Sequence, residues 1–233
     1  MPNETHMTVI SQYRRTPPAH VYQQISKMAA EYVADLSLVP IAPSNYLTAV
    51  YRFCLATEIE IYMDRMGLGP GRTELIVAED SSCPGRVTGF LLHLLVDGVP
   101  GATGIAYMAV DQRDRRKGVA RQMVTHLLNE YPHVELSCAV SKVPLYERLS
   151  FQVIGVRDTQ VRMNTRAYSA AGLIAALNVA EIYASAEAKQ IEQQIVQKYG
   201  RRALIDSTKQ ITRAYDQEVR KAEAYVLGRI GRL

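Results

Sequence analysis

The sequence predicts a mixed α/β domain, with a largely antiparallel sheet flanked by helices, followed by a C-terminal helical hairpin. Three observations support this fold class: short β-rich runs alternate with turns in the middle of the chain, helical spacing of apolar residues flanks them, and no β signal remains after residue 164. The chain has 233 residues, 48% of them hydrophobic, which is enough to bury a sizeable core. We therefore expect two domains, residues 1–164 and residues 165–233.

The distribution of charge divides the chain at the same point. Lys and Arg (27) exceed Asp and Glu (23) by four, too small an excess to require a polyanionic partner. Residues 1–164 hold 16 basic and 16 acidic side chains, whereas residues 165–233 hold 11 and 7, so the excess lies in the extension. The basic tail has no interleaved aromatic pattern, and the chain has no Trp, so we expect no specific nucleic-acid recognition.

Two helices are predicted ahead of the sheet. Apolar residues spaced by three and four predict an amphipathic helix from about residue 18 to residue 36, which Pro40 and Pro43 end. Ser44 can cap a second helix that continues to about Gly67. The glycine-rich residues 67–71 follow a helix and precede a strand, the reverse of a dinucleotide-binding loop, so they predict a turn.

The middle of the chain reads as a meander followed by alternating elements. Residues 73–80 and 86–96 predict a hairpin, and a turn at Asp97 and Gly98 leads to a third strand at 103–110. Helical spacing returns after Gly118 and ends at Tyr131. The remaining elements are a strand at 133–140, a short helix at 142–150 and a strand pair at 151–163, which gives the order ααβββαβαββ.

The extension is predicted to be helical throughout. Residues 165–188 hold nine alanines and no proline, which favours a continuous helix, and Tyr199 and Gly200 predict a turn. A second helix is indicated by a heptad-like seam with one polar member: Leu204, Thr208, Ile211, Tyr215, Glu218, Ala222 and Tyr225. Because so few large apolar residues make a weak core alone, we expect homo-oligomerisation or partner docking here. The alternative is a solvated extension that packs on its own domain.

Composition and terminal patterns address the compartment. The three cysteines form no C-x-x-C pair, which favours a reducing environment over a disulfide framework. The start of the chain has no basic segment followed by an apolar stretch, and no window of about 18 apolar residues could span a membrane. The five histidines have no metal-ligand spacing. We expect a cytoplasmic protein with no membrane span and no metal.

The segment from Val110 to Arg121 joins a strand end to a helix start and carries the most informative pattern. Backbone N–H groups at such a junction point into a concavity, and the helix dipole adds positive charge, so the turn can bind a pyrophosphate. Gly118 permits close backbone approach, and the small Ala120 leaves room for a ligand. Four basic side chains surround the turn: Arg115, Arg116, Lys117 and Arg121. The alternative is a basic helix start that only faces solvent.

At these residues the sequence resembles the GNAT superfamily of acyl-CoA-dependent N-acetyltransferases. The family pattern of Gln or Arg, two residues, Gly, one residue, then Gly or Ala is matched by Arg115, Gly118 and Ala120, and a family-typical valine by Val110. Further on, the stretch from Tyr146 to Phe151 looks like the family's Tyr-x-x-x-Gly-Phe. The resemblance covers about residues 8–164 and implies the acyl-CoA N-acyltransferase fold.

The resemblance implies an N-acetyltransferase that uses acetyl-CoA as co-substrate and a small-molecule or protein amine as acceptor. The backbone near Met108 and Val110 would bind the pantetheine arm and polarise the thioester carbonyl. Tyr146 would protonate the leaving thiolate, because a phenol with an ordinary pKa of about 10 keeps its proton at neutral pH. The implied cofactor-binding residues are Met108, Val110, Arg115, Arg116, Lys117, Gly118, Val119, Ala120 and Arg121.

The sequence departs from the family pattern in three places. Ser150 replaces the commoner glycine, and Ser141 stands where many members have asparagine. The strand at 103–110 has no Glu or Asp, so the general base that some members place there is missing. The possible substitutes on neighbouring strands are Glu79, Asp80 and His93.

A second class of function remains open because a fold can persist after catalysis is lost. The missing carboxylate and the alanine-rich extension also fit a catalytically weak or inactive structural or assembly protein. The composition of the extension resembles that of virion proteins of tailed bacteriophages. In this alternative the protein would be virion-associated.

Overall fold

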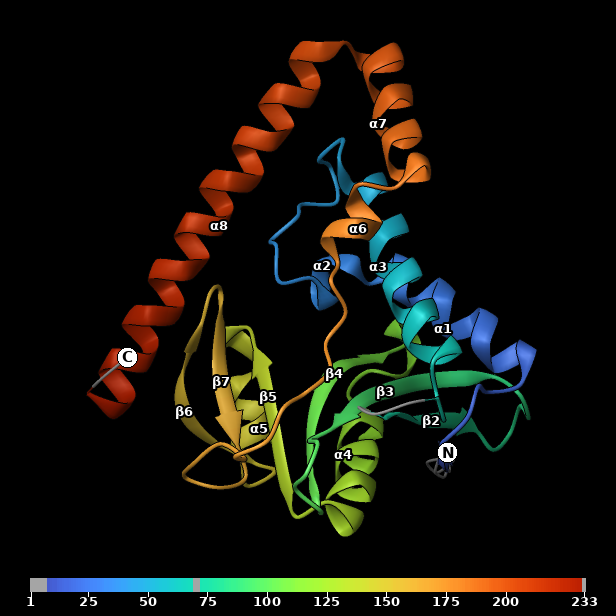
Figure 1. The fold of residues 1–233 in the computed structure, drawn as a ribbon, viewed down its shortest axis with the longest axis vertical. Helices are drawn as coiled ribbons and strands as arrows, with labels where there is room; N and C mark the ends of the chain where they lie inside the picture. The colour runs from blue at the N-terminus through green and yellow to red at the C-terminus, as the bar shows by residue number, and fades with distance from the viewer. Residues whose placement is uncertain (1–7, 69–71, 232–233) are drawn as a thin grey trace, which may run out of the picture. The chain divides into compact units, whose positions relative to one another are not determined.

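The computed structural model describes residues 8–68 and 72–231 (Figure 1). Residues 1–7, residues 69–71 of the predicted glycine-rich turn and residues 232–233 lie outside the described part. The strands are β1 (Thr8–Tyr13), β2 (Thr73–Asp80), β3 (Val87–Leu95), β4 (Ala102–Val110), β5 (His133–Cys138), β6 (Gln152–Arg157) and β7 (Gln160–Asn164). Their order is β1-β2-β3-β4-β5-β7-β6, with only β4 and β5 paired in parallel among the pairings described strand by strand. The predicted mixed α/β fold with a largely antiparallel sheet is confirmed.

The helices are α1 (Ala19–Glu31), α2 (Val33–Leu36), α3 (Thr48–Asp64), α4 (Val119–Glu130), α5 (Val143–Glu147), α6 (Ala180–Tyr183), α7 (Ala186–Tyr199) and α8 (Arg201–Ile230). Two short 3₁₀ helices are η1 (Gln112–Asp114) and η2 (Val140–Lys142). The chain forms two compact units. The first unit holds residues 1–28, 60–136 and 169–175, and the second unit holds residues 29–59, 137–168 and 176–233.

The first unit is built on the β1–β4 meander, with α4 packed on one of its faces (Figure 1). Gly89 of β3 explains how α4 lies so close to the strands. A Cβ at this position would lie 2.9 Å from the Ala109 carbonyl oxygen and 3.1 and 3.2 Å from side-chain atoms of Met123 and Val119. Glycine at residue 89 therefore allows α4 to pack directly against the sheet.

The segment 169–175 returns to the first unit after β7. The Asp97 amide donates to the Leu173 carbonyl oxygen at 2.8 Å, and a Cβ at Gly172 would lie only 2.3 Å from the Asp97 carbonyl oxygen. Residues 165–179 are consequently not helical, and the prediction of a continuous helix over 165–188 is wrong. Alanine raises helix propensity only slightly, and tertiary contacts override it here.

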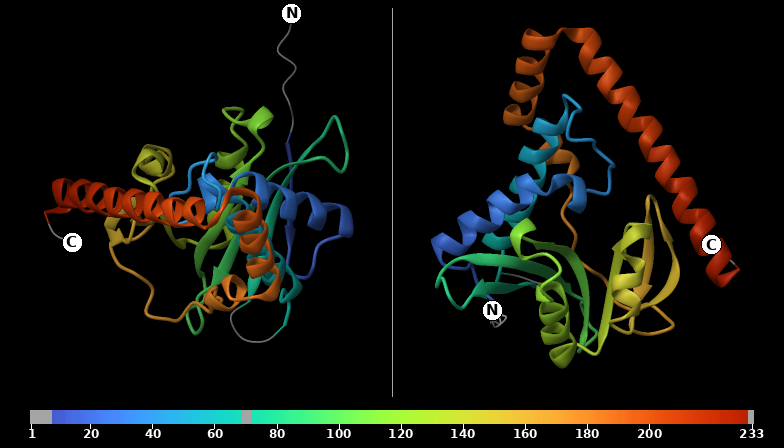
Figure 2. Two further views of the ribbon diagram at one scale, coloured as in Figure 1. Left: turned by 90° about the horizontal axis from the view of Figure 1, so that it is seen from above. Right: turned by 180° about the vertical axis from the view of Figure 1, so that it is seen from behind.

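The second unit contains β6, β7 and the C-terminal helices. The predicted turn at Gly200 is present with φ +83, but α7 and α8 diverge from it instead of running side by side (Figures 1 and 2). The long helix α8 packs against β6 and β7. Asn45 Nδ2 donates to the Ser207 carbonyl oxygen at 3.1 Å, and Tyr46 stacks on Tyr199 with centroids 4.4 Å apart.

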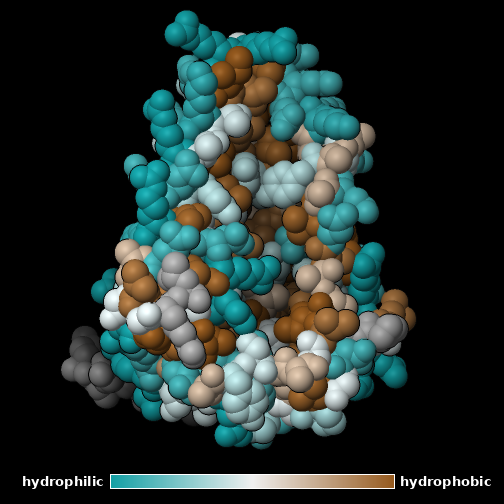
Figure 3. All heavy atoms as spheres, turned by 60° about the vertical axis from the view of Figure 1, so that its left-hand side comes forward, coloured by the Kyte–Doolittle hydropathy of each residue, from teal (hydrophilic) through white to brown (hydrophobic). Residues whose placement is uncertain are grey.

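The buried face of α8 follows the predicted seam only in part. Ile211 and Ala222 are buried as expected, whereas Ser207 and Val226 take the places predicted for Thr208 and Tyr225. The shift follows from the 3.6-residue period of a straight α-helix, which drifts away from a heptad repeat. In the space-filling view from this side, hydrophobic residues extend downward from the top, where α7 and α8 meet, between margins of hydrophilic residues, and further hydrophobic residues lie in the lower part of the view (Figure 3).

Two further boundaries differ from the prediction. Strand β1 was not predicted, and it pairs antiparallel with β2 alone, as an edge strand. Helix α3 begins at Thr48, four residues after the expected cap at Ser44.

Candidate active site

The predicted phosphate-binding turn lies wholly in the first unit, between β4 and α4. Asp111 caps η1 by accepting a hydrogen bond from the Arg113 amide at 3.0 Å, and two left-handed residues follow, Arg116 with φ +65 and Gly118 with φ +85. An L-residue rarely adopts such a φ, so Arg116 carries local strain, whereas Gly118 does not. The two positive angles turn the backbone through the concave bend that precedes α4.

The first turn of α4 offers its backbone N–H groups to a ligand. The first N–H groups of a helix have no intrahelical acceptor, and Gly118 at the N-cap provides no side-chain cap. A Cβ built on Gly118 would meet only Gln122 Nε2, at 4.0 Å, so the space above this residue is open. A 12-residue helix adds partial positive charge at this end. The open backbone and the helix dipole are features that could hold an anion, and phosphate binding at this turn stays a prediction.

The basic side chains of the turn have different roles. Arg115 Nε donates to the Val110 carbonyl oxygen at 3.2 Å, which holds the strand end against the turn. Lys117 Nζ lies 2.9 Å from Asp114 Oδ1, so its charge is shared with that carboxylate. Arg116 and Arg121 are exposed beside the open backbone. Val119 is buried against the sheet, so only its backbone can reach a ligand.

The second half of β4 exposes backbone groups on the edge away from β3. Along an antiparallel strand, the backbone groups of successive residues point alternately toward one neighbouring strand and toward the other. Those of Asp111 point toward β3, because its amide donates to the Thr88 carbonyl oxygen at 2.8 Å. Met108 and Val110 therefore direct their backbone groups away from β3. A bulge leaves Ala106 without an opposite residue, and the ladder between β4 and β5 extends only from Ala102 to Ile105. Met108 and Val110, which the resemblance assigns to the pantetheine arm, thus lie on the part of the β4 edge beyond its ladder with β5.

Tyr146 lies on α5 in the second unit, with 6% of its surface exposed. Its ring contacts Phe151 edge to face with centroids 5.7 Å apart, and the Tyr146 carbonyl oxygen accepts from the Phe151 amide at 3.1 Å. Burial, and secondarily the Cys138 thiol, raise the pKa of the Tyr146 phenol. The hydroxyl is therefore a proton donor and not a base over the whole neutral range.

Ser150 adopts φ +68, the conformation that favours the family-typical glycine. The tight turn is completed by hydrogen bonds from the Ser150 amide to Glu147 and from the Leu149 amide to Tyr146. The serine thus keeps the turn that connects Tyr146 to β6, with backbone strain that glycine would not have.

Two of the three candidate bases, Asp80 and His93, are held in structural roles. Ser82 and Arg86 donate hydrogen bonds to the Asp80 carboxylate, which hold the pKa of Asp80 far below its ordinary value. His93 is completely buried, and this burial lowers its pKa to about 3. Glu79 lies at the end of β2 opposite Val9 of β1. Strand β4 itself carries no carboxylate.

The sequence reasoning missed a buried ion network beneath the turn. Arg86 donates two hydrogen bonds to Asp114, at 2.7 and 3.1 Å, and two to Asp80, at 2.9 and 3.2 Å. Arg86 and Asp114 are 28 residues apart, and no local pattern links them. Only the pairing of strands brings the β2–β3 turn to the turn before α4.

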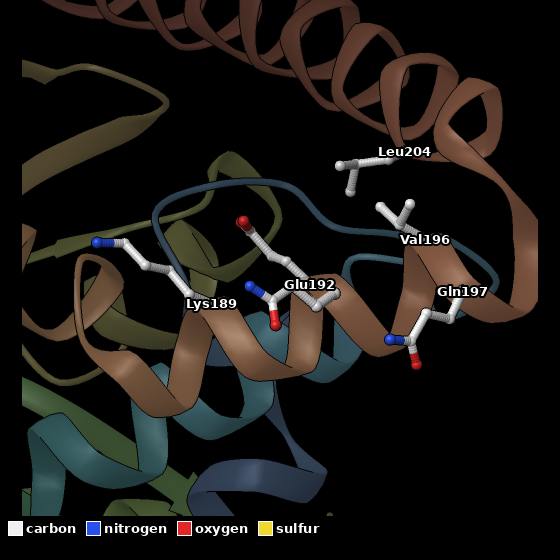
Figure 4. A pocket seen from close by; sticks show the side chains of 6 residues that line it. Lys189, Glu192, Val196, Gln197 and Leu204 are labelled. Carbon is white, nitrogen blue, oxygen red and sulfur yellow. The ribbon is translucent and has the colours of Figure 1, made fainter.

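A separate hollow of about 400 Å³ lies between α7 and α8 in the second unit (Figure 4). Val196 and Leu204 line one part of it, whereas Lys189 and Glu192 lie further along α7. Its lining residues in the described part of the chain include no nucleophile–base pair. Within residues 8–68 and 72–231, no group of three or more His, Cys, Asp or Glu side chains is placed to hold a metal ion. The helices described here include none that is long and apolar enough to cross a membrane.

Known proteins resemble this chain in sequence over one segment and in fold over most of its length. Residues 44–151 match the model of the Acetyltransferase (GNAT) family. No curated protein matches the sequence. The structure is similar to PaiA N-acetyltransferase from Thermoplasma acidophilum in complex with coenzyme A, with 10% identity, 68% of this chain and 99% of that chain covered, and a TM-score of 0.53. This likeness shows a shared fold.

Two further solved structures are less similar. An acyl-CoA N-acyltransferase from Pseudomonas aeruginosa has 14% identity and a TM-score of 0.48, covering 69% of this chain and 100% of that one. A GCN5-related N-acetyltransferase from Kribbella flavida has 15% identity and a TM-score of 0.47, covering 66% and 96%.

Proposed function

Because the chain carries a GNAT-family acetyltransferase domain at residues 44–151, we propose that it transfers an acetyl group from acetyl-CoA to a primary amine. The observation that carries this proposal is the continuity of two binding elements in the first unit. The part of the β4 edge beyond its ladder with β5 leads through η1 into the turn at the start of α4, where the first backbone N–H groups of the helix lie. A ligand with a polar arm and a pyrophosphate fits these elements in that order.

Residues of this chain would hold each part of the donor. The N–H groups of Val119, Ala120 and Arg121 would bind the pyrophosphate, and Arg116 and Arg121 would add charge. The backbone of Met108 and Val110 would pair with the amides of the pantetheine arm. When bound, acetyl-CoA supplies the thioester that the amine attacks. A backbone N–H at the bulge beside Ala106 would donate to its carbonyl oxygen.

Protons are handled by two groups in this proposal. Tyr146 gives its phenolic proton to the sulfur as the carbon–sulfur bond breaks, and its raised pKa means that the phenol is protonated at neutral pH. The acceptor amine loses its proton to water held by backbone carbonyl oxygens, because β4 has no carboxylate and both Asp80 and His93 are committed elsewhere.

Calorimetric titration with acetyl-CoA tests the donor, and mass spectrometry with a panel of primary amines tests the transfer. We expect saturable binding of acetyl-CoA and a mass gain of one acetyl group on at least one amine. Absence of binding removes the proposal. Binding without turnover across the panel favours the structural or assembly protein.

A further inference from the structure

Asp114 is a buried carboxylate in the same turn that is built to bind an anion. Only 3% of the residue is exposed, and its carboxylate receives two hydrogen bonds from Arg86 and one from Lys117. Burial raises the pKa of Asp114, but the hydrogen bonds from Arg86 and Lys117 outweigh this, so the net shift is downward and the side chain is ionised. An uncompensated charge of this sign would repel a phosphate at the start of α4.

Arg86 connects this carboxylate to the β2–β3 turn. Its guanidinium bridges Asp114 and Asp80, and Asp80 is itself fixed by the backbone amide and hydroxyl of Ser82, at 2.9 and 2.6 Å. Two-point arginine–carboxylate pairs specify orientation as well as distance. The side chain of Arg86 is 24% exposed, and those of its two partners are at most 8% exposed. The network is therefore a rigid link between two turns.

The link acts on the backbone that would bind the ligand. Asp114 is the last residue of η1, its amide donates to the Asp111 carbonyl oxygen at 2.9 Å, and the left-handed Arg116 follows two residues later. A side chain that is fixed at Asp114 determines where the chain leaves η1 and how it enters α4.

We propose that Arg86 is a positioning residue for the binding of coenzyme A, a role that rests on the proposed function. By holding Asp114 under the turn, it sets the direction of the N–H groups from Arg116 to Arg121. Arg86 touches no reacting atom. Its effect is confined to the phosphate-bearing half of the donor.

The test compares two donors in the full-length Arg86→Met variant. The dissociation constant for coenzyme A, measured by calorimetry, should rise at least tenfold. Turnover with acetyl-pantetheine, which lacks the pyrophosphate, should keep kcat/KM within about threefold of the parent. Unchanged affinity for coenzyme A, or an equal loss with both donors, would overturn the inference.

Arg14→Met is the matched control, because Arg14 also pairs with a buried carboxylate of the first unit, that of Glu74. It should lose stability while binding coenzyme A within about threefold of the parent. The double variant Arg86→Met/Asp114→Asn also removes the negative charge of Asp114, but residue 86 still cannot connect Asp80 to residue 114. Its affinity should stay low, and recovery to the parental value would show that Arg86 only neutralises Asp114.

Amide hydrogen exchange in the absence of ligand tests positioning without relying on activity. Exchange across residues 111–118 should quicken in Arg86→Met, or in Arg86→Lys if the methionine variant does not fold, and stay parental in Arg14→Met. Amide exchange at the parental rate in the Arg86 variants would overturn the inference. A parent protein that fails to bind coenzyme A would instead overturn the proposed function.

Discussion

Thr103 Oγ1 lies 2.9 Å from His93 Nδ1 and 2.9 Å from the Leu94 carbonyl oxygen. Because the carbonyl oxygen can only accept, the hydroxyl donates to it and accepts from Nδ1, which places the imidazole proton on Nδ1. Burial lowers the pKa of His93 to about 3, with Glu130 opposing this shift and Arg14 reinforcing it. The neutral imidazole is part of the core and not a general base.

This arrangement predicts that stability depends on pH. The pKa of His93 is lower in the folded protein than its ordinary value of about 6.5, so between about pH 3 and 6.5 the unfolded chain binds more protons and unfolding becomes easier as pH falls. At pH 5, His93 should lower the free energy of unfolding by ~2 kcal/mol relative to pH 7.

Urea unfolding at the two pH values measures this difference. His93→Asn, whose amide can still donate to Thr103, should show a correspondingly smaller change between pH 7 and pH 5. The same change in the parent and the variant would assign the pH dependence to other groups.

Gly118→Val should weaken acetyl-CoA binding at least tenfold, or about 1.4 kcal/mol, because the added Cβ enters the open space in front of the helix N-terminus. Gly98→Val provides the control, since Gly98 also has a positive φ and open surroundings but lies in the β3–β4 turn. Both variants should lose ~1–2 kcal/mol of stability, and only the first should lose affinity in calorimetry. Equal affinities would show that the ligand does not approach Gly118.

Tyr146→Phe should lower kcat by ~10²-fold with the acetyl-CoA dissociation constant changed less than about threefold, since only the proton is removed. Steady-state kinetics and calorimetry measure the two quantities. Tyr131→Phe is the control, because this buried tyrosine donates to Glu74 at 3.1 Å in the first unit. Parental turnover in Tyr146→Phe would make Tyr146 a packing residue.

Ser150→Gly should raise the free energy of unfolding by about 1 kcal/mol, because glycine adopts φ +68 without strain. Thermal unfolding should show a midpoint higher by about 2–4 °C. Ser141→Gly, in η2, should lower the midpoint or leave it unchanged. A lower midpoint for Ser150→Gly would show that the serine stabilises this turn through contacts of its own.

Truncation tests the predicted boundary at residue 164 and the role of the extension in assembly. A chain ending at Ala175 keeps the hydrogen bond between Asp97 and Leu173, whereas one ending at Asn164 loses it. Both should bind acetyl-CoA, the shorter one with lower stability, and light scattering should show a different assembly state from the full chain. A truncated chain with the parental assembly state would remove the extension as the oligomerisation element.

The sequence predicted those elements whose signals are local. Strand β2 has the predicted bounds, and α4 begins directly after Gly118, because a short β-rich apolar run and a left-handed glycine act over a few residues. Strand β1 was missed because Thr8–Tyr13 has little alternation and is stabilised by pairing with β2, far away in the sequence.

Features that depend on distant contacts were not predictable. The turn before α4 is visible in the order of its residues, but the pairing of Arg86 with Asp114 depends on how two separate turns meet. The non-helical segment 169–175 likewise depends on the close approach of Gly172 to Asp97. Helix propensity contains no information about that contact.

The return of residues 169–175 to the first unit also affects how this chain can fold during synthesis. The first unit draws on three stretches of sequence, and the last of them ends at residue 175. Its final stretch cannot join it until that residue has emerged from the ribosome, by which time β6 and β7 of the second unit have already been made. The first unit therefore cannot complete its folding before synthesis of the second unit has begun. In a nascent chain stalled before residue 169, both units would lack part of their sequence.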